Sequence, residues 1–188
     1  MPIQDAFSAG VEPGGLYTSQ EIKILICYML LGVGEPMERQ MVTELIAGNG
    51  MANFFETAAA VERLLREQQR SKERIAALSM ELVSHMAEAQ EYREGNICLF
   101  DDVLDEVALR ELVNLLMEKC SGIAAAFSGS DEEGYRYIMG SRELDMRSLA
   151  KELNSLIEGR GGGKARMIQG SASASASAIA AVFERDFR

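Results

Sequence analysis

Apolar residues recur at three- and four-residue spacing through the first third of the chain, which is the pattern of amphipathic helices. A Thr-Ser pair suited to capping precedes a helix expected over residues 20–31, and a second helix is expected over residues 38–47. The Gly-Asn-Gly turn that follows leads into a third helix from about Ala52. Three short helices with a glycine turn before the third are typical of a helix-turn-helix module, which we assign to residues 1–65.

The helical pattern does not stop at the end of this module. The 3-4 spacing continues, so that one helix can run from about Phe55 to Glu91. Its first half is too polar at the repeating positions for a strong coiled coil, whereas its second half is more apolar. We therefore assign residues 66–94 to a connector helix, which serves either as a spacer or as the seam of a homodimer.

Residues 95–188 alternate between short apolar runs and amphipathic stretches, which is the pattern of an α/β domain. The apolar runs predict strands over residues 97–100, 122–127, 135–139 and 165–169. The amphipathic stretches predict helices over residues 104–119, 146–157 and 178–187. Asp145 is the expected cap of the second of these helices.

Two polar segments and one low-complexity segment separate these elements. Residues 128–134 are expected to form a hairpin loop, and the glycine-rich residues 159–164 a loop before the last strand. The Ser-Ala alternation from Ser171 to Ala178 has the composition of a flexible linker, but its place before an amphipathic helix favours an ordered strand end or loop. The predicted fold class is α+β: a helix-turn-helix-like module, a long connector helix and a C-terminal α/β domain with a mixed sheet over residues 95–188.

The composition limits the classes of function. The 188 residues carry 19 basic and 29 acidic side chains, for a net charge of −10, which disfavours a general polyanion-binding surface. Residues 121–188 hold nine basic and nine acidic side chains, so the last third is the expected place for an anionic ligand. No apolar run is long enough to span a membrane. The three cysteines lack CxxC spacing and are expected to be reduced thiols in or near the core of a cytoplasmic protein.

Few residues could carry catalysis or bind a metal. His85 is the single histidine, so zinc sites rich in histidine and the Ser-His-Asp or Cys-His mechanisms lack partners, and its helical register predicts a helix-face residue. An acidic cluster could bind a hard cation, although the end of a strand and the start of a helix are the favoured explanation of it. The cluster consists of Asp101, Asp102, Asp105 and Glu106. We expect no cofactor and no catalytic residue; hydrolysis of an ester or phosphoester at this cluster is the third of three hypotheses.

The most informative segment is glycine-rich and basic, and its sequence is Gly159-Arg160-Gly161-Gly162-Gly163-Lys164-Ala165-Arg166. It has neither the spacing of a P-loop nor that of a dinucleotide-binding fingerprint. Consecutive glycines allow backbone N–H groups to turn toward one anion, and the Arg and Lys side chains add positive charge. The alternative is a tight loop at the start of a strand with incidental surface charge, and the spacing alone favours neither.

The string GRGGGKARMIQGSASASASAIAAVF closely resembles the end of the DHH-associated domain, which is the C-terminal domain of alanyl-tRNA synthetases and of the long-form alanyl-tRNA editing proteins. The glycine run, the basic residue and the Gln-Gly strand end of that family correspond to Gly161, Gly162, Gly163, Lys164, Gln169 and Gly170. Ala165 replaces the usual proline. The resemblance extends over about residues 60–188, and it implies a domain that recognises RNA, chiefly tRNA, and sometimes dimerises. The zinc-binding hydrolase motifs of the editing proteins are absent from the sequence.

This resemblance sets the expected ligand and site. The residues expected to bind RNA, with tRNA as the first candidate, are Arg160, Gly161, Gly162, Gly163, Lys164, Arg166 and Gln169. The basic side chains would contact phosphate or sugar, and the glutamine would read a base or a 2′-hydroxyl. The glycines, which have no side chain, would let the protein backbone approach the RNA closely. The predicted function is that of an accessory protein related to the alanyl-tRNA editing or synthetase machinery, without the hydrolase core.

Residues 5–65 resemble the amino-terminal part of a bacterial winged-helix-like family of unknown function, through the strings EIKILICYML and ELIAGNGMANFFE. The wing hairpin of that family has no counterpart, because the chain continues as a helix. DNA is the less expected ligand, since the would-be recognition helix offers only Arg63 and the module is net negative. The alternative prediction is a helix-turn-helix transcriptional regulator with an α/β ligand or dimerisation domain.

Overall fold

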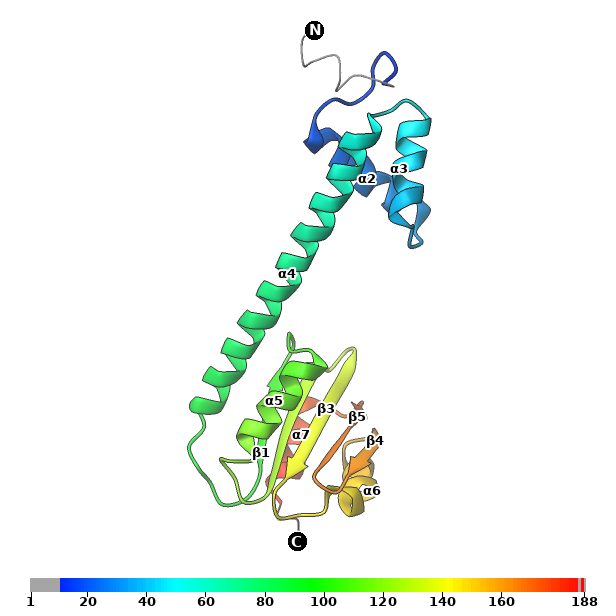
Figure 1. The fold of residues 1–188 in the computed structure, drawn as a ribbon. Helices are drawn as coiled ribbons and strands as arrows, with labels where there is room; N and C mark the ends of the chain where they lie inside the picture. Colours follow the sequence, from blue (N-terminus) through cyan, green and yellow to red (C-terminus); the bar gives the residue numbers. More distant parts are fainter. Residues whose placement is uncertain (1–10, 186, 188) are drawn as a thin grey trace. The chain divides into compact units, whose positions relative to one another are not determined.

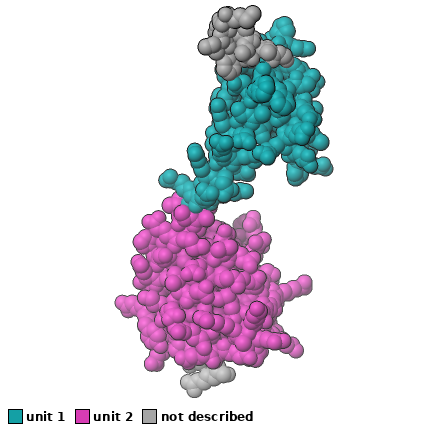
Figure 2. Space-filling model, in the orientation of Figure 1, with its two compact units in different colours: residues 1–74 teal, residues 75–188 magenta. Residues whose placement is uncertain are grey.

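The computed structural model describes residues 11–185 and residue 187, with the elements labelled in Figure 1. The chain forms two compact units, of which the first ends at Arg74 and the second begins at Ile75 (Figure 2). The start of the segment that resembles a winged-helix-like family lies outside the described residues. Within the described residues, no helix is both long enough and apolar enough to cross a membrane.

In the described part of the first unit, from residue 11 on, the chain forms three helices, as the apolar pattern predicts. α2 spans Ser19–Val33, α3 spans Arg39–Gly48, and the first half of α4 (Phe54–Glu88) completes the unit. Thr18 begins α2 with a capping box: its hydroxyl oxygen accepts the backbone N–H of Glu21, and the Glu21 carboxylate accepts that of Thr18 at 3.1 Å. The buried core of this unit consists of Ile22, Ile26, Val42, Ile46, Ala52, Ala60 and Val61.

α4 is one continuous helix of 35 residues, so the expected third helix and the connector form a single element. Side chains 65–78 are all exposed, and side-chain pairs such as Gln69 with Glu73 support this stretch. The apolar positions Ile75, Leu78 and Leu82 also stay exposed. No strand occurs between residues 11 and 96, so the wing hairpin is absent from this described stretch. A homodimer through α4 stays a prediction.

The second unit is built on a five-stranded mixed sheet in the order β1-β2-β3-β5-β4, as the predicted fold class requires. The strands are β1 (Ile97–Asp101), β2 (Ile123–Ser130), β3 (Gly134–Ser141), β4 (Gly159–Lys164) and β5 (Met167–Ala172). β1 pairs with β2 in parallel, and the other pairs are antiparallel. β5 inserts between β3 and β4 although it follows both in the sequence, which makes β4 an edge strand.

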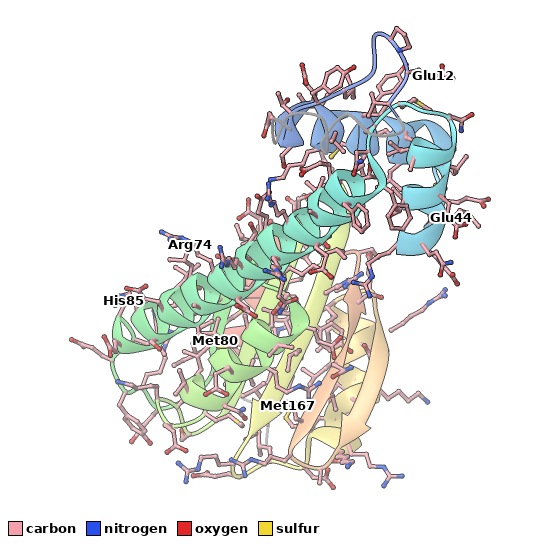
Figure 3. The ribbon with its side chains drawn as sticks, turned by 45° about the horizontal axis from the view of Figure 1, so that its top comes forward. Glu12, Glu44, Arg74, Met80, His85 and Met167 are labelled. Carbon is pink, nitrogen blue, oxygen red and sulfur yellow. The ribbon has the colours of Figure 1, made fainter. Side chains whose placement is uncertain are left out.

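Helices cover the two faces of this sheet to different extents. α5 (Glu106–Leu116) and the end of α4 lie on one face, while α6 (Met146–Leu156) and α7 (Ala176–Phe183) lie on the other (Figure 1). Met80 of α4 and Met167 of β5, labelled in Figure 3, pack against the core under α5. The predicted cap of α6 is confirmed, because the Asp145 carboxylate accepts a backbone N–H of the first turn.

The structure corrects the prediction for the glycine-rich segment. Gly159–Lys164 is not a loop but the strand β4, paired with β5 along its whole length. The turn consists instead of Ala165 and Arg166, whose carbonyl oxygens accept the N–H groups of Met146 at 2.7 Å and Ser141 at 3.2 Å. Glycine has no side chain whose pattern distinguishes a strand from a loop, so the local sequence carries no signal for this strand.

The Ser-Ala repeat is ordered, as its position predicts. It supplies the end of β5, a short connection and the start of α7, which Ser175 caps. The hairpin between β2 and β3, expected over residues 128–134, has a shorter loop than predicted, because β2 continues to Ser130 and β3 already begins at Gly134.

Candidate nucleic-acid interface

α5 covers only part of its face of the sheet. It packs on β2 and β3, while the side chains of β4 and β5 that point to this face are exposed, except for Met167, which is half-buried. The first turn of α5 and the strands β3, β5 and β4 line a groove of about 1010 Å³. Since alternate residues of a strand point to opposite faces, the strand register decides which side chains enter the groove.

Two arginines and a serine form a row across three neighbouring strands, which we call the arginine row. Arg136 of β3 is paired with Ser171 of β5, and Ser171 is paired in turn with Arg160 of β4. Paired residues share a face, and all three are exposed and line the groove. The spacing between strands places the two arginine Cα atoms about 10 Å apart. Neither arginine forms an ion pair with another described residue.

The next pairs along β4 and β5 extend the same face. Gln169 is paired with Gly162, and Met167 is paired with Lys164. The structure therefore brings three predicted site residues, Gly162, Lys164 and Gln169, to the face of the arginine row. Lys164 lies beyond the residues that line the groove, and Arg166 is exposed in the turn at this end of the sheet.

Gly161 and Gly163 point to the opposite face, toward α6, and so differ from the prediction that the glycine run as a whole approaches a ligand. A Cβ on Gly161 would collide with the hydroxyl of Tyr137 and would lie 2.7 Å from the Cα of Gly170. The Tyr137 hydroxyl donates to Oδ1 of Asn154 at 2.6 Å, and Nδ2 of Asn154 donates to the Gly161 carbonyl at 3.1 Å. Burial raises the pKa of Tyr137, which keeps its hydroxyl protonated. The absence of a side chain at Gly161 thus allows β4 to pack closely against β5 and Tyr137.

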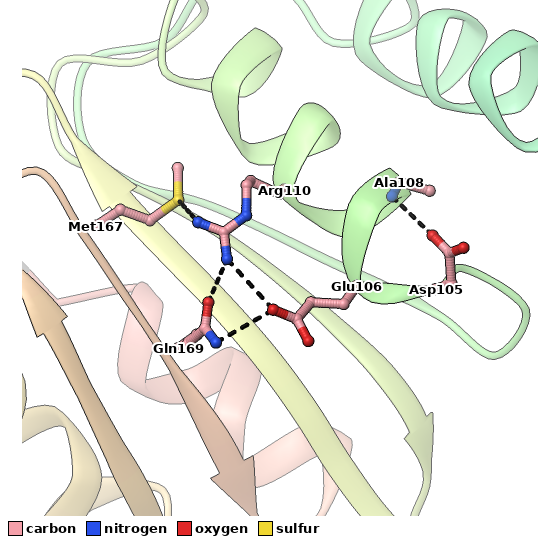
Figure 4. A network of polar contacts seen from close by, with 6 residues as sticks. All are labelled: Asp105, Glu106, Ala108, Arg110, Met167 and Gln169. Atoms are coloured by element: carbon pink, nitrogen blue, oxygen red, sulfur yellow. Dashed lines mark hydrogen bonds and ion pairs between the residues drawn. The ribbon is translucent and has the colours of Figure 1, made fainter.

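Gln169, the predicted base reader, is engaged within the protein. Its side-chain oxygen accepts a hydrogen bond from Arg110 of α5, and its Nε2 donates to Glu106 at 3.1 Å (Figure 4). Arg110 also lies 3.3 Å from Glu106, which is one helical turn away on α5. The glutamine therefore connects the open strands to the helix that borders the groove.

The electrostatic character of the groove changes along the strands. Glu133 and Glu158 immediately precede β3 and β4 and line one end, and Asp105 and Glu106 line the side of α5. Asp105 is occupied as the cap of α5, because its Oδ1 accepts the N–H of Ala108 at 2.8 Å. The basic side chains run from the arginine row to the turn at the other end of β4. This arrangement suits a ligand with several separate negative charges and neutral polar groups between them.

Sequence reasoning missed Arg136, Ser171 and Arg110, and it placed Glu106 in the acidic cluster rather than in the groove. One signal was available: Tyr135 and Tyr137 are apolar neighbours within a strand, so the arginine between them must point to the other face. The position of that face beside β4 was not available, because it depends on the order of the strands.

Two residues of the acidic cluster, Asp101 and Asp105, have the structural role that the sequence favoured. Oδ1 of Asp101 accepts the N–H groups of Val103 and Leu104, both at 2.8 Å, at the end of β1. Asp105 caps the helix that follows. His85 is an exposed residue on α4, 3.7 Å from the carboxylate of Glu88, as expected for a helix face (Figure 3).

The cysteines agree only in part with the prediction of core thiols. Cys120 is buried and Cys98 is half-buried, and burial raises the pKa of Cys98 to about 12 and that of Cys120 in the same direction. Cys27, in contrast, is exposed on α2. Its place in an apolar helical segment predicted burial, but none of the described residues of the first unit covers the outer side of α2.

Comparison with known proteins confirms the resemblance of the second unit. Residues 94–185 match the family model described as the DHHA1 domain. An alanine–tRNA ligase of Acholeplasma laidlawii (strain PG-8A) is 29% identical over 77 residues, which make up 41% of this chain and 9% of that protein. The chain thus matches less than a tenth of that relative's length.

Two groups of solved structures resemble parts of the fold. The C-Ala domain of the alanyl-tRNA synthetase from Aquifex aeolicus has 17% identity and a TM-score of 0.38, over 50% of this chain and 91% of that chain. RecJ from Thermus thermophilus, in complex with Mg²⁺, has 14% identity and a TM-score of 0.46, over 78% of this chain and 22% of that chain. Both similarities are distant and concern the fold alone.

Proposed function

With residues 94–185 matching the DHHA1 domain, we propose that the second unit binds nucleic acid, and that tRNA is its ligand. The observation that carries the proposal is the arginine row, in which Arg136 and Arg160 flank Ser171 on an open sheet face. The similarity to part of an alanine–tRNA ligase supports tRNA over other nucleic acids. The chain would then act as an accessory module that binds RNA for the alanyl-tRNA machinery.

The geometry of the row suits a chain of phosphates. Arginine side chains hold phosphate oxygens in bidentate fashion, and the two arginines of the row have no carboxylate partner to displace among the described residues. Lys164 lies four residues from Arg160 along β4, which adds a third cation about 13 Å away on the same face. The net charge of the whole chain is negative, so we expect this patch to hold the ligand locally rather than through a general field.

The test is a salt titration of tRNA binding by the full chain and by the double variant Arg136→Ala/Arg160→Ala. Each lost phosphate contact lowers the slope of log affinity against log salt by about 0.7 to 0.9, so we expect a decrease of about 1.5. The affinity should fall about tenfold near physiological salt, because two exposed charge-assisted contacts are lost.

A matched control removes the same charge from the covered side of the sheet. Arg147→Ala/Lys151→Ala changes two exposed cations of α6, away from the groove. This variant should keep the wild-type slope. Equal losses in both double variants would show that only net charge matters, and would remove the groove from the interface.

As part of the same proposal, the chain itself breaks no bond. No step of catalysis is needed for a module that positions RNA, and two residues of the acidic cluster, Asp101 and Asp105, are engaged in a turn and a helix cap. Hydrolysis of mischarged alanyl-tRNA by the purified chain, abolished by a chelator, would contradict this part of the proposal.

A further inference from the structure

An arginine of α5 lies beside the arginine row without belonging to it. One terminal nitrogen of Arg110 donates a hydrogen bond to Oε1 of Gln169 and lies 3.3 Å from Oε1 of Glu106. Nε2 of Gln169 donates to the same Glu106 oxygen at 3.1 Å, so that the three side chains close a ring of contacts (Figure 4). The other terminal nitrogen of Arg110 lies 3.7 Å from Sδ of Met167.

These contacts occupy the groups that a bound RNA would use. Gln169 lies two residues from Ser171 on the same strand face, about 7 Å from the arginine row. The amide oxygen of Gln169 is taken by Arg110 and its nitrogen by Glu106. The positive charge of Arg110 is neutralised by the Glu106 carboxylate. In this arrangement one terminal nitrogen of Arg110 and the side-chain amide of Gln169 are engaged with each other and with Glu106.

We propose that Glu106 keeps Arg110 in an ion pair in the free protein, and that a phosphate of the bound RNA displaces this carboxylate and binds Arg110 in its place. This inference rests on the proposed function and adds a regulating contact to the same groove. A guanidinium offers the same fork of donors to a carboxylate and to a phosphate, so the two compete for it. The exchange costs little, because the Arg110 and Glu106 side chains are 45% and 58% exposed and such pairs contribute little to stability.

The exchange also releases Gln169. Once Glu106 has left Arg110, the ring of contacts is open and the amide of Gln169 can pair with a base edge or a ribose hydroxyl. The groove would therefore favour a ligand that presents a phosphate near α5 together with a hydrogen-bonding group near β5. This coupling gives Glu106 a role in selectivity although it carries the same sign of charge as the ligand.

Two substitutions of Glu106 in the full chain test the proposal by salt titration of tRNA binding. Glu106→Gln removes the charge that holds Arg110, and Glu106→Asp keeps the charge but shortens the side chain so that it cannot reach Arg110 and Gln169 together. Both variants should bind tRNA about two- to fivefold more tightly, which is the range expected for freeing one exposed ion pair. The salt slope should stay that of the wild type, because Arg110 already contacts a phosphate in the complex that the wild type forms, and only the cost of displacing Glu106 is removed.

Two controls separate this exchange from simple charge repulsion. Glu111→Gln removes the same charge from an exposed position of α5 and should leave affinity and slope unchanged. Arg110→Ala alone should weaken tRNA binding and lower the slope by about 0.7, because one phosphate contact is lost, and Glu106→Gln should bring no gain in that variant. A gain that survives without Arg110, or that Glu111→Gln reproduces, would mean that Glu106 only repels the ligand, and would overturn the proposal.

The arginine-row variant separates the proposed function from the proposed exchange at Arg110. If Arg136→Ala/Arg160→Ala weakens tRNA binding but neither Glu106 variant strengthens it, the exchange at Arg110 is wrong and the proposed function stands. If the arginine row has no effect either, both proposals fall. A gain from both Glu106 variants that depends on Arg110, together with a loss from the arginine row, supports both.

Discussion

The two faces of the C-terminal sheet are made by the same strands but differ in how far helices cover them. Beneath α6 and α7, β2 and β3 present large side chains, among them Phe127, Tyr135 and Tyr137, and all three are buried. Beneath α5, β2 presents Ala124 and Ala126, which are small enough for the helix to lie close. α5 lies over β2 and β3, so on that face the residues of β4 and β5 stay exposed, except for Met167, which is half-buried.

The comparison shows how neighbouring residues of one strand take different roles. In β4, Gly161 is pressed against Tyr137 on the covered face, whereas a Cβ added to Gly162 would meet no heavy atom within 4 Å on the open face. In β3, Arg136 lines the groove while the tyrosines on either side of it are buried. We therefore expect substitutions on the covered face to change stability, and substitutions on the open face to change binding.

The largest expected effect is that of Phe127→Ala on the covered face. The Phe127 ring stacks on Phe100 with centroids 5.1 Å apart and meets Phe183 edge-on at 5.9 Å. Truncating such a buried ring removes both apolar burial and packing, and we expect a loss of about 3–5 kcal/mol in the free energy of unfolding. Guanidinium denaturation followed by circular dichroism measures this loss.

Arg136→Ala is the matched substitution on the open face. It should change the free energy of unfolding by less than about 0.5 kcal/mol, as exposed substitutions usually do. The same denaturation experiment checks both variants. A loss of several kcal/mol for Arg136→Ala would show that the arginine row supports the fold, and the division between the two faces would then be wrong.

A smaller effect is expected within the glycine run itself. Gly161→Ala places a methyl group against the Tyr137 hydroxyl and the neighbouring strand, so we expect a loss of about 1–3 kcal/mol in the free energy of unfolding. Gly162→Ala enters open space at an ordinary backbone conformation and should change it by less than about 0.5 kcal/mol. Equal stabilities of the two variants, measured by thermal denaturation, would contradict the assignment of faces.

Local patterns in the sequence were enough for most of this fold. Alternation and helical spacing gave the type and order of the elements, since each depends on neighbours within a few residues. The caps at Thr18 and Asp145 were readable for the same reason. The glycine run was misassigned, because a strand without side chains has no alternation to read and is held by its pairing with β5.

The sequence predicted only part of the site, because the rest depends on the order of the strands and on where α5 lies over the sheet. Arg160, Lys164 and Gln169 were found because the family string contains them. Arg136 was not found, because it precedes Arg160 by more than twenty residues and reaches it only through the intervening strand β5. Arg110 lies 59 residues before its partner Gln169, on a helix whose position over the sheet no local pattern gives.

The smallest expected effect concerns Asp131, which joins the β2–β3 hairpin to α7 on the covered side. Its Oδ1 accepts the backbone N–H of Ala176 at 2.7 Å and the hydroxyl of Tyr135 at 2.8 Å, and these bonds lower its pKa. A pKa below that of the unfolded chain means stability that is present above about pH 4 and lost as the carboxylate is protonated. Asp131→Asn keeps an accepting oxygen but no charge, so the melting temperatures of wild type and variant should converge between pH 7 and pH 3. Parallel curves, or equal convergence for Glu132→Gln in the same turn, would show that the hydrogen bonds to Asp131 do not favour its ionised form.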